Sequence, residues 1–314
     1  MISVIIVNYN RKDLLKNCLD SVRMQSVRDI ETIVVDNGSS DGSSDMARLG
    51  YSEVKLIENK ENLYFCRANN QGIKEARGDF ILCLNSDCIL EKDYIKEALE
   101  SFKLDGKIGM VSGKLLRPDK KTIDSTGLFL GRNRKPLERG YGKPDNGQYK
   151  NPGYVFGVSG ACMLMKKEML EDIKDENGYF DETFEIYYED LDLCWRAQKK
   201  GWKAYYNPEA IAYHERGATA VAENRDCFGL RPRNDRLFCD LSEGLKKKYI
   251  RNRYKCMKKN DSIVGIVLNS PFILWYELKL WSYMVLDSAF SLARTIFFER
   301  TKRVEKKKSL DRNP

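Results

Sequence analysis

The chain has 314 residues, of which 42% are hydrophobic and 32% are charged, and its formal net charge is +8. The hydrophobic share suffices for a buried core at this length, whereas the charged share excludes a protein that crosses a membrane many times. The nine cysteines are odd in number and no two have C-x-x-C spacing, which disfavours a disulfide framework and a zinc ribbon. We therefore expect a cytoplasmic protein, in a reducing compartment.

The first half of the sequence alternates between two patterns. Strand-like apolar runs and helical runs follow one another at residues 2–7 (strand), 14–22 (helix), 30–35 (strand), 54–57 (strand), 69–76 (helix), 79–84 (strand) and 94–102 (helix). This alternation predicts an α/β fold with a mostly parallel sheet. Ligands of such sheets bind beyond the carboxyl ends of the strands, where this sequence places Asn8, Asp36 and Asp87. These three side chains therefore predict one binding site at one edge of the sheet.

The second half is less regular. Glycine, proline and charged residues in 117–153 predict a long loop with short strands. The segment 155–165 is apolar, and 181–195 begins acidic and continues with helical spacing. Basic residues concentrate in 246–260, and an apolar, aromatic segment follows over 263–298. Clustered positive charge suggests an anionic partner, although a solvated face would have the same composition.

Asn85, Ser86 and Asp87 directly follow the apolar run 79–84. A carboxylate there could bind Mg²⁺ or Mn²⁺ beside a pyrophosphate, because these ions prefer oxygen ligands and often take only one or two carboxylates. The alternative is a simple turn, which Asn, Ser and Asp all favour. Residues 38–42 lack the Gly-Lys-Ser/Thr ending of a phosphate-binding loop, which disfavours a kinase or an ATPase.

The most distinctive segment contains Glu189, Asp190 and Asp192. Three acids in four residues are costly to hold together unless a cation or a helix N-terminus offsets their charge. One carboxylate could act as a general base on a hydroxyl, or the acids could simply complement a helix dipole. Trp195 falls on the helical face that is expected to meet the core.

Two further residues allow a functional and a structural interpretation. Asp36 could accept a hydrogen bond from a base or a ribose, or it could open a turn at Gly38. His214 is the only histidine in the chain, so it could be a metal ligand or an acid/base group, although a lone histidine is more often structural. A single histidine also excludes the multi-histidine metallohydrolases.

Taken in order, these segments resemble glycosyltransferase family 2, the inverting enzymes of the GT-A fold. The matching stretches, spread over roughly the first 255 residues, are Val4–Asn10, Ile33–Gly42, Glu61–Leu63, Ala68–Gly72, Gly78–Phe80, Asn85–Asp87, Gly178–Glu182, Tyr188–Arg196, Gly201–Lys203 and His214. Within the family the sequence looks most similar to bacterial rhamnosyltransferase-type enzymes that build cell-surface polysaccharides. The resemblance implies a Rossmann-like mixed sheet flanked by helices, followed by a C-terminal helical extension.

The resemblance also implies roles for individual residues. The residues expected at the donor site are Asn8, Asp36, Asn62, Arg67, Asn70, Asn85 and Ser86. Asp87 matches the last acid of the family's D-x-D motif and would hold Mn²⁺ or Mg²⁺. His214 matches a histidine that joins the metal shell in galactofuranosyltransferases. Asp190 matches the acid that deprotonates the acceptor hydroxyl, and Glu189, Asp192 and Trp195 would lie in the acceptor region.

The sequence departs from the family pattern at two places. Asn85 stands where the D-x-D motif begins with Asp, so the site has less negative charge and the metal would lean on the donor's own phosphates. Residues 64–67, Tyr-Phe-Cys-Arg, replace the small residues that are more usual. Arg67 could therefore touch the donor phosphate, or this loop could shape a different sugar pocket.

The resulting hypothesis is a metal-dependent, inverting transfer of a sugar from a dTDP- or UDP-sugar to a hydroxyl of a cell-surface glycan or a lipid-linked acceptor. L-Rhamnose is the leading candidate for the sugar. We expect a catalytic domain over residues 1–245, with a donor half over about 1–115 and an acceptor half over about 116–245. Two alternatives stay open: a nucleotidyltransferase, and a non-catalytic protein built on a related α/β fold.

Residues 246–314 form the expected C-terminal extension. The uncharged run 262–276 is short for a bilayer span, and Pro271 should interrupt it. Aromatic residues between basic clusters favour peripheral contact with the inner face of the cell membrane. The alternative is a helical hairpin that packs on the catalytic domain or on a second subunit in a homo-oligomer. No nucleic-acid partner is expected.

Overall fold

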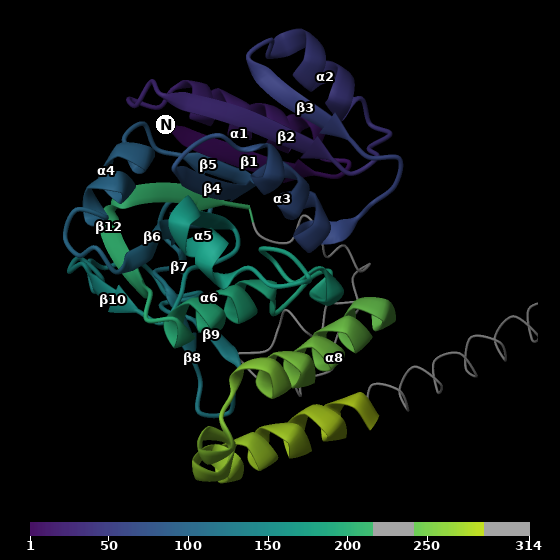
Figure 1. Cartoon of the computed structure of the whole chain (residues 1–314), viewed down its shortest axis with the longest axis vertical. Coiled ribbons are helices and arrows are strands. Elements are labelled where there is room, and N and C mark those ends of the chain that lie inside the picture. The colour runs from purple at the N-terminus through teal and green to yellow at the C-terminus, as the bar shows by residue number, and fades with distance from the viewer. Residues whose placement is uncertain (216–241, 286–314) are drawn as a thin grey trace, which may run out of the picture. The chain divides into compact units, whose positions relative to one another are not determined.

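A computed structural model of the chain describes residues 1–215 and 242–285 (Figure 1). The described residues belong to two compact units. The first comprises Met1–Gly131 and Lys135–Asn260, and the second comprises Arg132–Arg134 together with the residues from Asp261 onward. The predicted domain boundary between residues 245 and 246 falls inside a helix of the first unit, and the units divide after Asn260.

The first unit is built around one mixed sheet. Its strands in chain order are β1 (Ile2–Asn8), β2 (Ile30–Asp36), β3 (Val54–Glu58), β4 (Phe80–Asn85), β5 (Cys88–Leu90), β6 (Ile108–Leu116), β7 (Ile123–Ser125), β10 (Gly153–Val155), β11 (Cys162–Lys166) and β12 (Lys203–His214). The strand order is β10-β12-β6-β11-β4-β1-β2-β3, with β5 paired to β12 and β7 paired to β6. β8 (Leu128–Leu130) and β9 (Pro136–Glu138) form a separate hairpin within the expected long loop.

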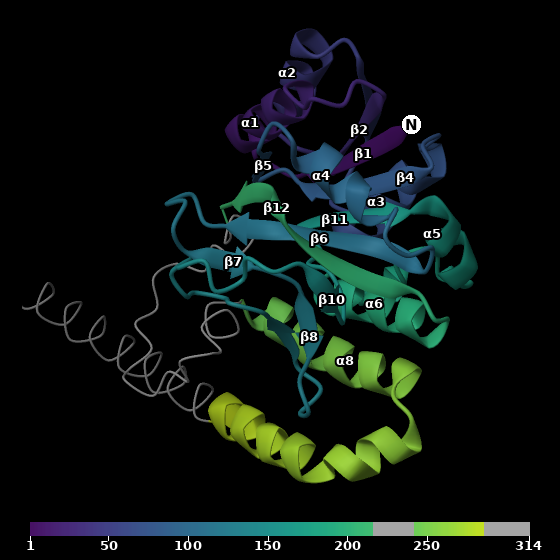
Figure 2. The ribbon, with the colours of Figure 1, turned by 90° about the vertical axis from the view of Figure 1, so that its left-hand side faces the viewer.

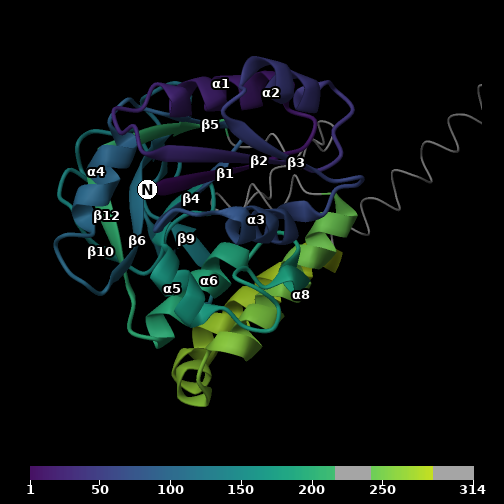
Figure 3. The ribbon, with the colours of Figure 1, turned by 45° about the horizontal axis from the view of Figure 1, so that its top comes forward.

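The helices cover both faces of this sheet. They are α1 (Lys12–Arg23), α2 (Ser43–Gly50), α3 (Tyr64–Glu75), α4 (Tyr94–Ser101), α5 (Lys167–Ile173), α6 (Glu189–Lys199) and α8 (Glu243–Asn260), with one 3₁₀ turn, η1 (Glu182–Phe184). α1 and α2 lie on one face, and α3, α5 and α6 lie on the other (Figure 3). The sequence therefore predicted the layers and the parallel core strands correctly.

The centre of the sheet explains why the polar residues meet. β1 lies between β2 and β4, is parallel to both, and is buried along nearly its whole length. The β1–β2 register pairs Asn8 with Asp36, and the β1–β4 register pairs Val7 with Asn85. Because the carboxyl ends of these three strands are level, the side chains that follow them share one edge.

α3 differs from its prediction because it begins at Tyr64 rather than at residue 69. The first N–H groups of a helix lack partners inside the helix. Here the backbone N–H groups of Phe65 and Cys66 donate to the carbonyl oxygen of Glu185, at 3.1 and 3.2 Å. This tertiary partner lies more than a hundred residues away in sequence, which local pattern cannot reveal. Arg67 consequently lies on a helix and not in a loop.

α8 packs against α6 within the first unit (Figure 2). Its buried side chains recur every three or four residues, as the stripe Lys246, Tyr249, Arg253, Cys256 and Asn260 shows. That stripe is polar, so α8 is held by hydrogen bonds and ion pairs more than by apolar burial.

The second unit contains one described helix, Ile263–Val285. It continues through Pro271, so the expected interruption at that residue is wrong. Proline lacks the N–H that would bond the carbonyl four residues earlier. The hydroxyl of Ser270 donates to that carbonyl, the oxygen of Val267, at 2.8 Å. Expectations for residues 216–241 and 286–314 lie outside the described residues.

Candidate functional site

Asn8 and Asp36 close the ends of β1 and β2 and are both buried. The Asn8 amide donates to Asp36 Oδ2 at 3.0 Å and to Ser39 Oγ at 3.3 Å. The backbone N–H of Ser39 donates to the other Asp36 oxygen at 2.8 Å. Among the described residues, Asn8 Oδ1 is buried with no hydrogen-bond partner. A buried orphan acceptor at a sheet edge is costly unless a ligand supplies a donor.

Asp87 and His214 meet because β5 pairs with the end of β12. The antiparallel register places His214 opposite Cys88, and Asp87 immediately precedes β5. His214 Nε2 lies 3.3 Å from Asp87 Oδ1. The backbone N–H of Glu215 donates to the Asp87 carbonyl at 3.0 Å, which extends this pairing by one residue. Two residues that are far apart in sequence are thus held together by backbone pairing.

Asp124 supports His214 from the other side of the imidazole ring. His214 Nδ1 lies 2.8 Å from Asp124 Oδ2, and Arg117 Nε lies 2.9 Å from Asp124 Oδ1. Burial lowers the pKa of His214, but the hydrogen bonds to Asp124 and Asp87 outweigh it and raise that pKa to about 9. We call Asp87, His214 and Asp124 the metal corner. Asp124 was not predicted from the sequence, because it lies on the short strand β7 in the segment expected to be a long loop.

The metal corner fits a hard divalent cation. The ligand atoms of Asp87, Cys88 and His214 all lie within 4.8 Å of one another. Burial raises the pKa of the Cys88 thiol well above its usual range, and its sulfur donates to the Ala161 carbonyl at 3.3 Å. A protonated thiol is a poor ligand, so the candidate donors are one carboxylate oxygen and one imidazole nitrogen. Because its pKa is raised, His214 must release a proton when a cation binds at Nε2. A carboxylate that orients a ligating histidine is common at metal sites.

Asp190 is connected through two consecutive residues to Asn85, which lies two residues before Asp87. The backbone N–H of Gly160 donates to Asp190 Oδ2 at 3.3 Å, and the carbonyl of Ala161 accepts from the backbone N–H of Asn85 at 2.9 Å. The backbone N–H of Leu191 donates to Asp190 Oδ1 at 2.7 Å. The acid that the sequence singled out and the Asn85–Asp87 segment therefore border the same loop.

Glu189 and Asp192 take different surroundings from Asp190. Glu189 is buried, its Oε2 has no hydrogen-bond partner among the described residues, and burial together with the charge of Asp190 raises its pKa well above the usual range. Asp192 is fully buried and bonds Arg196 at 2.9 Å and Asn260 at 2.7 Å. A cation thus offsets this acid, as the sequence required, but its carboxylate faces the protein and has a structural role.

Several expected donor residues also have partners inside the protein. Asn70 is buried, and its amide both donates to and accepts from the backbone of Phe180, at 2.8 and 2.9 Å. Arg67 pairs with Glu182 at 3.2 Å. Asn62 accepts from the backbone N–H of Tyr64 at 2.9 Å. The contact of Asn62 fixes the residues that lead into α3. The contacts of Arg67 and Asn70 hold the loop that follows α5 against α3.

The remaining predicted residues lie on the same framework. Ser86 is buried and Asn85 is half-buried in the segment that leads from β4 to Asp87. Trp195 is buried on α6 and meets Phe156 edge to face, with ring centroids 6.1 Å apart. The buried position of Trp195 agrees with its helical spacing.

Comparison with known proteins gives a consistent result. A family model described as "Glycosyl transferase family 2" matches residues 3–174. A poly-β-1,6-N-acetyl-D-glucosamine synthase of Staphylococcus aureus (strain MSSA476) is 27% identical over 214 residues, which are 68% of this chain and 49% of that protein. The chain thus spans about half the length of that relative.

Two solved structures have a similar fold. The mannosyltransferase PcManGT from Pyrobaculum calidifontis, in complex with GDP-Man and Mn²⁺, has a TM-score of 0.56 at 18% identity. The match covers 89% of this chain and 69% of the mannosyltransferase chain. GalNAc-T7 with UDP, GalNAc and Mn²⁺ has a TM-score of 0.56 at 16% identity. That match covers 68% of this chain and 43% of the GalNAc-T7 chain. These likenesses confirm the predicted GT-A fold. Nothing in the comparisons supports the rhamnosyltransferase-like subgroup, which stays a prediction.

Proposed function

Because this chain belongs to glycosyl transferase family 2, we propose that it moves a sugar from a nucleoside diphosphate to a hydroxyl of a cell-surface polysaccharide or a lipid-linked acceptor, with inversion. The observation that carries the proposal is that a candidate metal site and a candidate general base border the same loop. The metal corner offers a carboxylate and an imidazole 3.3 Å apart, and Asp190 is bonded to Gly160 beside the segment that bears Asp87.

Asp87 and His214 are the residues that would hold the metal. A divalent cation bound there would stabilise the negative charge that develops on the departing nucleoside diphosphate. Asp124 holds His214 by Nδ1 and thereby leaves Nε2 directed at Asp87. Mn²⁺ or Mg²⁺ fits this oxygen and nitrogen set, and the solved structures of similar fold contain Mn²⁺.

Asp190 would take the proton of the acceptor hydroxyl while its oxygen attacks the anomeric carbon. The bond to the leaving phosphate oxygen breaks on the opposite face, so one displacement inverts the configuration. Burial and the charge of Asp190 raise the pKa of the neighbouring Glu189 well above its usual range, which favours the neutral form of Glu189. Two backbone N–H groups, from Gly160 and Leu191, orient the carboxylate of Asp190.

The donor would place its base and ribose against Asn8 and Asp36, where the orphan Asn8 Oδ1 could accept from a base N–H. A UDP- or dTDP-linked donor therefore stays our proposal. Among sugars, L-rhamnose rests on the sequence resemblance, and N-acetylglucosamine is named by the polymer that the staphylococcal relative synthesises.

A donor screen and one substitution test the function. UDP-, dTDP- and GDP-linked sugars should be assayed for hydrolysis or transfer with MnCl₂ or MgCl₂, and at least one UDP- or dTDP-sugar should react only with metal. Asp190→Asn should lower turnover about a hundredfold or more, since a positioned general base contributes roughly 10²–10⁴. The same variant should bind UDP with MnCl₂ as the parent does. Near-parental turnover by Asp190→Asn would remove this residue from the mechanism.

We also propose peripheral attachment to an anionic membrane through the helix Ile263–Val285. This helix is long and apolar enough to cross a membrane by length and composition, and most of it is exposed. Trp275 and Trp281 are 62% and 51% exposed, and tryptophan favours the membrane interface. Glu277 and Lys279 fall within the helix, and basic clusters flank it in the sequence. These charges favour a position on the surface of the membrane over a span.

Vesicle sedimentation tests this attachment. The whole chain should sediment with phosphatidylglycerol vesicles and less so in high salt, because basic residues contribute electrostatic binding. Trp275→Ser combined with Trp281→Ser should weaken it severalfold. Leu49→Ser, which changes an even more exposed apolar residue on α2, serves as the control and should sediment normally. If the double variant and the parent sediment alike, this helix is not the membrane contact and a second subunit becomes the better partner.

A further inference from the structure

The backbone immediately before Asp190 adopts an unusual conformation. Glu185, Tyr187 and Tyr188 have φ angles of 64°, 69° and 70°. Residues with a Cβ rarely adopt the left-handed region, and they persist there only where the surrounding structure holds them. Tyr188 is the residue from which α6 begins. The conformation of this segment therefore sets where α6 starts and where the Asp190 side chain lies.

α8 supplies the contacts that hold this segment. The amide of Asn252 donates to the carbonyl oxygens of Phe184, Ile186 and Tyr187, at 2.7, 2.8 and 3.0 Å. Asn252 is fully buried, so water cannot replace these bonds when the side chain is changed. One side chain thus fixes three carbonyls that lie before and between the left-handed residues.

Neighbours of Asn252 on α8 contact the same segment. Arg251 donates to the Thr183 carbonyl at 3.3 Å and pairs with Glu185 at 3.4 Å, and Lys248 also pairs with Glu185. The ring of Tyr249 packs edge to face against Tyr188, with centroids 5.0 Å apart. From the opposite side, the start of α3 donates to the Glu185 carbonyl. The segment is consequently held between α3 and α8.

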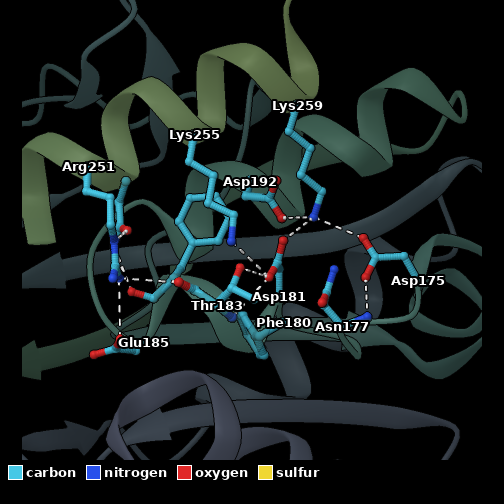
Figure 4. Close-up of polar contacts among 12 residues, drawn as sticks. Asp175, Asn177, Phe180, Asp181, Thr183, Glu185, Asp192, Arg251, Lys255 and Lys259 are labelled. Carbon is cyan, nitrogen blue, oxygen red and sulfur yellow. Dashed lines mark hydrogen bonds and ion pairs between the residues drawn. The ribbon is translucent and has the colours of Figure 1, made fainter.

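Lys259 anchors the far end of α8 (Figure 4). Its Nζ lies 2.7 Å from Asp181, 2.9 Å from Asp175 and 3.3 Å from Asp192. Asp181 and Asp192 have almost no exposed side-chain surface. Lys255 approaches Asp181 as well, at 3.4 Å. The Lys259 ammonium thus joins α8 to the loop after α5 and to α6. These contacts fix the position of α8 along its axis, and therefore also the position of Asn252.

We propose that Asn252 is a positioning residue for sugar transfer: it holds the left-handed segment Glu185–Tyr188 so that α6 presents Asp190 to the acceptor. We call two sets of contacts the α8 latch: Asn252 with the segment Glu185–Tyr188 that it holds, and Lys259 with the three carboxylates that it pairs with. The proposal rests on the proposed function for its kinetic consequence, but the geometric claim is independent of it. The family match ends at residue 174, so the latch and the segment it holds both lie beyond the matched region.

The test compares Asn252→Asp with the parent chain. An ionised carboxylate has nearly the same shape but cannot donate to three carbonyl oxygens. Turnover should fall about 10- to 100-fold, because small misplacement of a reacting group has effects of this size. The dissociation constant for UDP with MnCl₂ should stay within twofold. Lys258→Gln, an exposed change on the same helix, should leave both quantities unchanged.

Two kinetic results would overturn the proposal. Parental turnover by Asn252→Asp is one, and an equal loss of turnover and UDP binding is the other, because it indicates a general structural defect. If Asn252→Asp does not fold, Arg251→Gln provides the same comparison with a smaller expected loss of turnover, since its guanidinium is half exposed.

Hydrogen exchange separates this proposal from the proposed function. In Asn252→Asp the amides of residues 184–192 should exchange faster, whereas those of β1 and β4 should not change. This readout needs no substrate. A parent chain that transfers no sugar would contradict the proposed function. The positioning claim would then be decided by hydrogen exchange alone. Unchanged exchange over 184–192 would sink the positioning claim even in an active enzyme.

Discussion

The metal corner and the α8 latch both serve the proposed site, but different parts of the chain hold them together. In the metal corner, strand pairing sets His214 opposite Cys88 and thereby places it beside Asp87. In the α8 latch, side chains of one helix reach main-chain oxygens and carboxylates that lie more than sixty residues away in sequence. Backbone pairing tolerates most single substitutions. Contacts made by side chains, as in the α8 latch, instead depend on one or two particular residues.

Among substitutions in these two regions, the largest loss of stability is expected at Lys259. Lys259→Met leaves the buried carboxylates of Asp181 and Asp192 without their shared cation. Removal of one partner from a buried ion pair costs about 3–5 kcal/mol. Lys255 still lies 3.4 Å from Asp181 and Arg196 lies 2.9 Å from Asp192, so the expected loss is near the lower end of that range. Urea unfolding should show a loss of stability of this order. The matched change Lys258→Met, on an exposed residue, should stay within about 0.5 kcal/mol of the parent. Equal midpoints for the two variants would show that Lys259 is not holding the loop.

A smaller and more local effect is expected at Asp124. Asp124→Asn keeps the shape of the side chain but weakens its hold on His214. Changes to groups that orient a metal ligand typically cost about 10- to 100-fold in metal affinity or activity. Mn²⁺ titration in the presence of UDP should show such a loss, and Asp45→Asn, an exposed acid on α2, should show none. Unaltered Mn²⁺ affinity in Asp124→Asn would remove Asp124 from the metal corner.

These two regions also differ in how far sequence could predict them. Asn8, Asp36 and Asp87 each follow an apolar strand, and the rule that ligands bind at the carboxyl ends of parallel strands was enough to group them. His214 could be joined to them only through the family resemblance, because its partner strand β5 has three residues and no distinctive pattern. Asp124 gave no signal, since it lies on a three-residue strand within a glycine- and proline-rich segment.

The α8 latch was invisible for another reason. Helix prediction relies on an apolar stripe, and the buried stripe of α8 is Lys246, Tyr249, Arg253, Cys256 and Asn260. The sequence therefore suggested a solvated basic segment and placed a domain boundary inside it. The acids Glu189, Asp190 and Asp192 did indicate that a cation was needed, and Arg196, four residues after Asp192, supplies one. Nothing local showed that Lys259 would supply a second. Partners of buried polar groups are set by tertiary packing.

Acid sensitivity should distinguish the α8 latch by its pH window. Burial raises the pKa of Asp181, but Lys259 and Thr183 outweigh it and lower that pKa to about 2, from an ordinary value of 3.8. The folded state therefore gains stability from ionised Asp181 above about pH 4 and loses that gain as pH falls toward about 2. The stability difference between the parent and Asp181→Asn should shrink over this window. A difference that stays constant from pH 7 to pH 2.5 would contradict the assignment.

The smallest expected effect concerns Cys88, whose sulfur lies within 4.8 Å of the ligand atoms of Asp87 and His214 but which is not part of the metal corner. Its thiol is kept protonated by burial and donates to the Ala161 carbonyl, so it should contribute nothing to metal binding. Cys88→Ala should therefore leave the Mn²⁺ affinity within twofold, with a modest loss of stability from the removed sulfur. A tenfold loss of Mn²⁺ affinity would instead make the thiolate a ligand. Thiolate ligation favours softer ions than Mn²⁺ or Mg²⁺, so Zn²⁺ would then have to be compared with them in the transfer assay.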